Sequence, residues 1–232
     1  MHITTPTLYH TIVIRSTAQA NALASALKRN PDFGRYIKKL RLEGAYGDKL
    51  KIRATASPDI PDLCMSLAIW ADSGITGLTK VMSAINARRV ILMTAFSTSS
   101  LNKKHTQVLD KLCQCIASWT NLETFYFSGS SVVSSPEVDK HFRLTEALTN
   151  SISLRAIHIW LDHWLSLTIL DRPCRLLFEI LASDDYLERL YVHGDMASEI
   201  PVYLNSRAVV LSPRICSYRR PFTSQFVLFP NG

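Results

Sequence analysis

The chain has 232 residues, of which 47% are apolar and 19% are charged. This balance is typical of a globular protein and excludes disorder over most of the length, because disordered chains combine few apolar residues with high charge. The formal net charge of +7 favours acidic partners, although a basic surface that is simply solvated gives the same value.

The cysteines and the apolar stretches indicate where the protein is located. Five cysteines at irregular spacing predict free thiols in a reducing compartment rather than a disulfide framework. Cys113 and Cys115 lack a second pair at zinc-binding distance, so we expect no metal site. Residues 1–15 do not read as a signal peptide, and no apolar stretch approaches the roughly 18 residues of a membrane span. We therefore expect no membrane partner and a cytoplasmic or nuclear location.

One short pattern, apolar-x-x-apolar-x-apolar, recurs along the chain and predicts a strand at each copy. The second half of each copy alternates at period two, as strands do. The central residues of successive copies are 19 to 35 positions apart. The copies begin at Tyr9, Ile37, Ile60, Ala87, Leu122, Leu154 and Leu187, and a weaker last copy begins at Ser206.

Amphipathic helices are predicted in most gaps between these strands, from apolar residues at i, i+3, i+4 and i+7. The first ends at Asn30-Pro31, because the residue before a proline disfavours helix. Asp72 and Ser73 are candidate caps for the second helix. The predicted segments are 20–27, 78–85, 109–116, 144–148 and 174–181, and 44–59 shows no clear pattern.

Charged residues between the apolar ones decide between two arrangements of alternating strands and helices. In a doubly wound fold both sheet faces are covered, so strands are apolar throughout. Here Lys39, Arg89 and Arg189 fall inside the strands, and a buried unpaired charge is costly. The prediction is an α/β fold: an irregular leucine-rich-repeat-like solenoid with parallel strands on the inner face and helices outside. Residues 1–212 form this single domain, and 213–232 form a C-terminal tail or cap.

The exposed inner face is the candidate binding site. Arginine and aromatic side chains concentrate binding energy at protein interfaces. The predicted partner-binding residues on this face are Lys39, Arg41, Arg89, Tyr126, His158, Trp160, Arg189 and Tyr191. Local packing of Trp160 and Tyr126 under loops is the alternative at these two positions. The expected partner is an acidic or phosphorylated protein segment.

No catalytic constellation emerges, so we expect a protein that is not an enzyme and needs no cofactor. The sequence has no Gly-x-Ser-x-Gly elbow. His158, His163 and His193 lie near Asp162 and Asp195, but a nucleophile–base arrangement needs a third positioned group that we cannot name.

Four segments within about residues 6–95, at 6–14, 22–44, 60–67 and 86–92, carry a resemblance to a known family. They resemble the F-box proteins of mushroom-forming fungi. The first of these looks like the segment that follows the F-box. The resemblance implies an F-box/leucine-rich-repeat-like protein, in which an N-terminal F-box binds a Skp-type adaptor of a cullin ubiquitin ligase and the repeats hold the substrate.

The chain starts almost directly at the first strand, so the resemblance implies the substrate-recognition part without the F-box. A ligase adaptor is expected as a partner only if an F-box is encoded upstream. The leading expectation is a protein–protein interaction module. The alternative is a nucleic-acid-binding basic repeat protein, based on the net charge and the basic run 28–41. We expect protein rather than nucleic acid as the partner.

Overall fold

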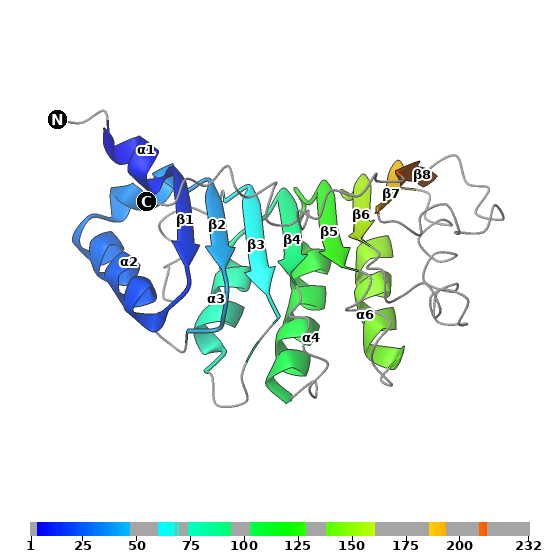
Figure 1. The fold of residues 1–232 in the computed structure, drawn as a ribbon, viewed down its shortest axis with the longest axis horizontal. Coiled ribbons are helices and arrows are strands. Elements are labelled where there is room, and N and C mark those ends of the chain that lie inside the picture. Colours follow the sequence, from blue (N-terminus) through cyan, green and yellow to red (C-terminus); the bar gives the residue numbers. More distant parts are fainter. Residues whose placement is uncertain are drawn as a thin grey trace.

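The strands form one open parallel sheet in which their spatial order follows the sequence. The computed structural model describes residues 4–46, 60–67, 69, 74–93, 103–128, 138–160, 186–193 and 209–212. Within these residues eight strands pair in the order β1 to β8, and every pair is parallel (Figure 1). The strands are β1 Thr11–Ile14, β2 Lys39–Leu42, β3 Asp62–Ser66, β4 Arg89–Met93, β5 Thr124–Ser128, β6 Ala156–Trp160, β7 Arg189–His193 and β8 Val209–Ser212.

All eight predicted strand positions are confirmed, because the apolar pattern marks the residues that the sheet buries. The central residues of neighbouring copies are register partners, such as Leu40 with Leu63 and Ile157 with Leu190. From β2 to β7 this apolar row is no more than 1% exposed at any position. Removing so much apolar surface from water is the main force that holds the strands side by side.

Helix α1 precedes β1, the other described helical elements lie between strands along the chain, and three of these lie behind the sheet in Figure 1. In that view α3, α4 and α6 stand next to one another behind the middle of the sheet. Their apolar residues join those of the strands in one buried cluster. The helical elements are α1 Thr4–His10, α2 Thr17–Arg29, the 3₁₀ helix η1 Pro31–Tyr36, α3 Thr76–Ala84, α4 Lys103–Ser118 and α6 Val138–Thr149.

Helix α2 shows why the chain changes structure where the sequence indicates. The backbone N–H of Gln19 donates to Ser16 Oγ at 3.2 Å, which caps the helix start. The helix ends at Arg29, and Asn30 is extended before Pro31, as predicted. The Asn30 side chain then accepts a hydrogen bond from the Asp32 N–H at 3.2 Å and starts η1.

One sequence prediction about an element boundary needs correction, and several others fall outside the described residues. Tyr9 belongs to α1 rather than to the first strand, because its ring packs on Phe33 of η1 with centroids 4.6 Å apart. Helix α3 starts after Ile75, which makes no side-chain cap. The candidate caps Asp72 and Ser73 lie outside the described residues, as do the predicted helix 174–181 and the tail 213–232.

Candidate functional site

The strand side chains that alternate with the buried apolar rows form three rows across the other face of the sheet. Because the parallel register does not slip, equivalent positions of neighbouring strands lie side by side. The first row is Thr11, Lys39, Asp62, Arg89, Thr124, Ala156 and Arg189. The second row is Val13, Arg41, Cys64, Ile91, Tyr126, His158 and Tyr191. The third row includes Ser66, Met93, Trp160 and His193.

Only part of this face is accessible, which corrects the expectation of a face open along its whole length. In the second row Cys64 is 1% exposed and Ile91 is 5% exposed, and in the third row Ser66 is 8% exposed. The side chain of Trp160 is 6% exposed, so the prediction that Trp160 is an exposed binding residue is wrong. The described members of the first row, by contrast, are all at least partly accessible. The first row is therefore accessible along its whole length, and we call it the accessible strip, whereas the second row is partly accessible only toward its two ends.

Arg89 in the first row is held by a two-point ion pair. Its Nε donates to Asp62 Oδ1 at 3.0 Å and its Nη2 to Asp62 Oδ2 at 2.6 Å, between neighbouring strands. The hydrogen bond to Asp62 raises the pKa of Arg89, with a further contribution from Tyr126. The pair fixes the guanidinium over the sheet while leaving 44% of the Arg89 side chain exposed.

Three rings in the second row form a stack, which we call the aromatic ladder: Tyr126, His158 and Tyr191. The Tyr126 and His158 centroids are 4.2 Å apart at 17°, and those of His158 and Tyr191 are 4.3 Å apart at 11°. Arg189 Nη1 donates to the Tyr191 hydroxyl at 3.3 Å. Stacking fixes the ring planes, and the two tyrosines present their hydroxyls beside Arg89 and Arg189.

A histidine pair joins the aromatic ladder to the third row. His158 Nδ1 lies 3.0 Å from His193 Nε2, and the His193 ring stacks on Trp160 with centroids 4.2 Å apart. Burial lowers the pKa of His158 to about 4, and the charge of His193 contributes in the same direction. His158 is therefore neutral near pH 7 and can share a hydrogen bond with His193. His163, Asp162 and Asp195, which the sequence places near this pair, lie outside the described residues.

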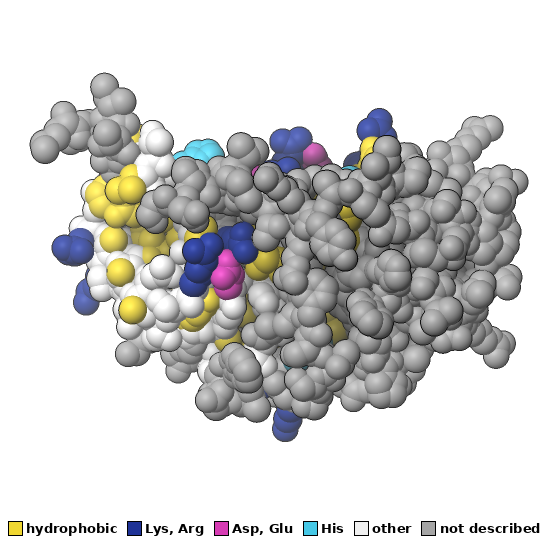
Figure 2. All heavy atoms as spheres, in the orientation of Figure 1, with side chains coloured by type: hydrophobic (Ala, Val, Ile, Leu, Met, Phe, Trp, Pro, Cys, Tyr) yellow, Lys and Arg dark blue, Asp and Glu magenta, His cyan; other side chains and the backbone are white. Residues whose placement is uncertain are grey.

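A second charged group lies at the other end of the face, on β1 and β2. Glu43 Oε1 lies 2.8 Å from Arg41 Nε and 3.2 Å from Arg15 Nε. Figure 2 shows basic side chains gathered around an acidic one over the ends of these strands. Arg41 is only 17% exposed, so this predicted binding residue is largely engaged with its neighbours. Lys39 is in the accessible first row.

Exposed ion pairs connect the residues that immediately precede neighbouring strands, and our sequence reasoning missed them. Arg88 Nε lies 2.7 Å from Glu123 Oε2, and Arg155 Nε lies 3.6 Å from Glu188 Oε1. The available signal was the alternation of charge at the residue before each of β4 to β7. These four charges offset one another, which leaves Lys39, Arg89 and Arg189, together with Asp62, to set the charge of the accessible strip.

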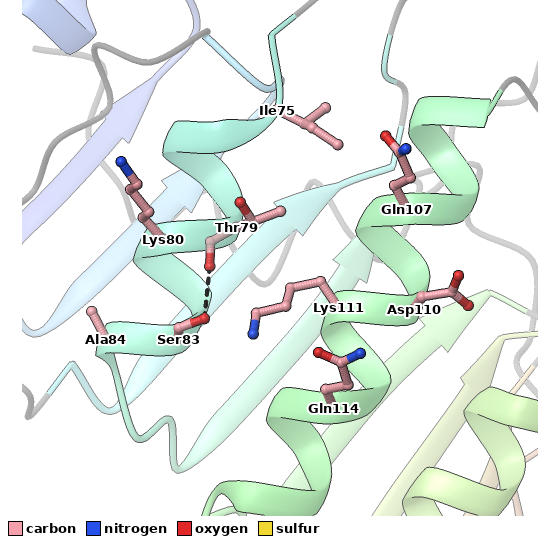
Figure 3. Close-up of a pocket in the computed structure, with 9 residues that line it drawn as sticks. All are labelled: Ile75, Thr79, Lys80, Ser83, Ala84, Gln107, Asp110, Lys111 and Gln114. Atoms are coloured by element: carbon pink, nitrogen blue, oxygen red, sulfur yellow. Dashed lines mark hydrogen bonds between the residues drawn. The ribbon is translucent and has the colours of Figure 1, made fainter.

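The helical side of the molecule has an open groove between α3 and α4, with a volume of about 620 Å³. Figure 3 shows Lys111 reaching toward α3, while Asp110 points to the opposite side of α4. Asp110 is paired there with Arg143 at 3.0 Å. Except for Ile75 and Ala84, the lining residues are polar or charged: Thr79, Lys80, Ser83, Gln107, Asp110, Lys111 and Gln114. Such side chains are typical of a solvated helix surface, and no motif in the sequence singles out this groove.

The basic run 28–41 is divided among several elements. Lys28 and Arg29 lie in the last turn of α2, where positive charge stabilises the helix dipole. Arg35 donates to the Tyr36 hydroxyl at 2.7 Å. Much of this charge therefore has a local structural use, which weakens the argument that the run is a nucleic-acid site.

The fold and the site define an α/β protein with a single open parallel sheet that presents basic side chains at the starts of its strands and aromatic side chains in the next row. No protein-family model matches the chain, and no curated protein matches it. Within the described residues, no three His, Cys, Asp or Glu side chains are grouped so that they could hold a metal ion. None of the helices that the structure describes is long and apolar enough to span a membrane.

Proposed function

We propose that this chain is a leucine-rich-repeat-like solenoid whose accessible strip binds an acidic or phosphorylated segment of a partner protein. The main support is the net positive charge of the first row, which contains Lys39, Arg89 and Arg189 and a single carboxylate, Asp62. A surface with a net positive charge attracts and orients a segment with a net negative charge. The proposed activity is binding, without catalysis.

The solenoid part of the proposal is supported by the strand order. Each strand pairs with the next strand in sequence, as expected when each repeat contacts only its neighbours. The described helices α3, α4 and α6 each fall between two consecutive strands. The unequal repeat lengths fit this arrangement, since extra residues can be placed outside the strands.

The aromatic ladder supports a protein partner. Tyr126, His158 and Tyr191 are partly accessible and rigidly stacked, so contact with them costs little side-chain entropy. Tyrosine and arginine are the residue types most often found at the energetic centres of protein interfaces. Both types lie together at Arg89 with Tyr126 and at Arg189 with Tyr191.

The binding experiment uses a fluorescent decaglutamate peptide and the full chain at low salt. We expect saturable binding that weakens about tenfold in Arg189→Glu, because charge reversal removes a charge-assisted hydrogen bond and adds repulsion. Arg143→Glu is the matched control, since Arg143 is an exposed arginine on the helical side. Absence of binding by the folded parent, or equal losses in the two variants, would contradict the proposal.

Resemblance to F-box proteins extends the proposal to the substrate-recognition part of a cullin-type ubiquitin ligase. A protein held by the accessible strip should then be degraded faster when the strip is intact. The test compares cells in which the gene, with any F-box encoded upstream of this chain, is unchanged with cells in which the same gene carries Arg89→Glu/Arg189→Glu. A protein that binds only the parent should have a longer half-life in the variant cells. An unchanged half-life would remove the ligase role and leave the binding function standing.

Nucleic acid is the alternative partner, based on the net charge of +7. Contacts with phosphates release counterions, so their affinity falls steeply as salt rises. A single-stranded oligonucleotide titrated at increasing salt measures this slope directly. The alternative would replace the protein-binding proposal if the oligonucleotide bound more tightly than decaglutamate at every salt concentration.

A further inference from the structure

Two short side chains lie between two arginines in the first row, and we call this stretch of four positions the trough. Arg89, Thr124, Ala156 and Arg189 are successive register partners on β4, β5, β6 and β7. The two middle side chains are small, and both are partly accessible. The aromatic ladder runs along the last three of these four strands, β5 to β7, in the next row. A ligand in the trough would therefore lie over short side chains, beside the rings, with a guanidinium at each end.

The distance between the two arginines follows from the sheet. Neighbouring strands are about 4.8 Å apart, so three spacings place the backbones of Arg89 and Arg189 about 14 Å apart. An extended peptide advances about 3.3 Å per residue, so four residues cover about 13 Å. Residues i and i+4 of an extended segment also point to the same side, whereas residues i and i+3 point to opposite sides.

We infer that the trough binds an extended segment that crosses the strands and has two acidic residues four positions apart, one at each arginine. This inference rests on the proposed function and specifies the charge spacing of the partner. Carboxylates suit both ends because guanidinium groups bind them in plane through parallel hydrogen bonds.

The two ends of the trough differ in how much of the guanidinium is already engaged. Arg89 uses Nε and Nη2 on Asp62, which also offsets its charge. Arg189 uses Nη1 on the Tyr191 hydroxyl, and the charge of Glu188 acts on it, but it makes no ion pair with a carboxylate among the residues that the structure describes. The N–H groups of Arg189 Nε and Nη2 can therefore donate hydrogen bonds to both oxygens of a carboxylate. We therefore expect Arg189 to contribute more to the binding energy, and Arg89 to determine which spacing of the two acidic residues binds best.

The experiment compares peptides of identical composition that contain two glutamates in a serine and glycine background, placed one, two, three or four positions apart. Binding to the full chain is measured by fluorescence anisotropy at low salt. We expect the spacing of four to bind about tenfold tighter than the others. Arg189→Gln should abolish this preference, and Arg89→Gln should reduce it. Arg143→Gln, which removes the same charge on the helical side, should leave it intact.

The outcomes separate the two proposals. Equal affinity for all spacings, or a preference that survives in a folded Arg189→Gln variant, overturns the inference about spacing while the binding function remains. Failure of the folded parent to bind any of these peptides and decaglutamate overturns the binding function itself. Circular dichroism of each variant shows whether it is folded, and Arg189 is an exposed residue, so its replacement should not unfold the chain.

Discussion

His158 and His193, on neighbouring strands, share a hydrogen bond between Nδ1 and Nε2 at 3.0 Å. One ring must donate and the other accept, so the pair is stable only while at least one ring is neutral. His158 is also stacked between Tyr126 and Tyr191, where a charged imidazolium would lose hydration. This arrangement makes the stability of the sheet depend on pH.

The free energy of unfolding should fall as the pH is lowered from about 6.5 toward 4. The pKa of His158 is lowered from 6.5 to about 4 in the folded chain, so the unfolded chain binds more protons in this window. The contribution is fully present above 6.5 and is lost as the pH falls through 4. Urea denaturation at several pH values measures it. His158→Gln should show a smaller decrease over this window than the parent.

The matched control for this effect is His10→Gln, because His10 is exposed. Its stability should follow the same pH dependence as the parent. The interpretation would be wrong if His158→Gln and His10→Gln lost stability with falling pH to the same extent.

Trp160→Ala should destabilise the fold by about 3–5 kcal/mol, the usual cost of removing a buried large aromatic side chain. Trp160 is 6% exposed and stacks on His193. Chemical denaturation monitored by circular dichroism measures the loss. Tyr186→Ala is the control, since Tyr186 is 53% exposed and its removal should change stability by no more than about 0.5 kcal/mol. Similar small effects for both would show that Trp160 is not part of the core.

Leu190→Ala should cost about 2–5 kcal/mol, because Leu190 is 0% exposed within the apolar row of β7. Its partner in the register is Ile157 on β6, so the cavity would open between two strands. Thermal and urea unfolding measure the effect. Leu8→Ala provides the comparison, as Leu8 is 73% exposed. If Leu190→Ala and Leu8→Ala lost the same amount of stability, Leu190 could not be a core residue.

Asp62 and Arg89 should show a coupling energy of about 1 kcal/mol in a double-mutant cycle with Asp62→Asn and Arg89→Gln. The pair has two hydrogen bonds, and the Asp62 side chain is only 17% exposed. The more exposed Asp110–Arg143 pair, at 38% and 62%, should show less coupling. Coupling at Asp62–Arg89 should also fall with added salt, although less steeply than for a fully exposed pair. Zero coupling at low salt would contradict the proposed two-point contact.

The sequence by itself determined where the strands lie and which residues enter the core. The apolar pattern is local, and a strand such as β2 buries every second side chain. The same reasoning placed Arg89, Tyr126 and His158 on one face, and the register of the sheet brings these positions onto neighbouring strands.

Only the tertiary structure decided which part of that face is accessible and which side chains meet on it. Trp160 alternates along its strand just as His158 does, yet it is buried against His193. The contact between His158 and His193 and the pairing of Arg88 with Glu123 join residues that are more than 30 positions apart. Their meeting depends on strand pairing and on what packs over the sheet, and a local pattern carries no information about either.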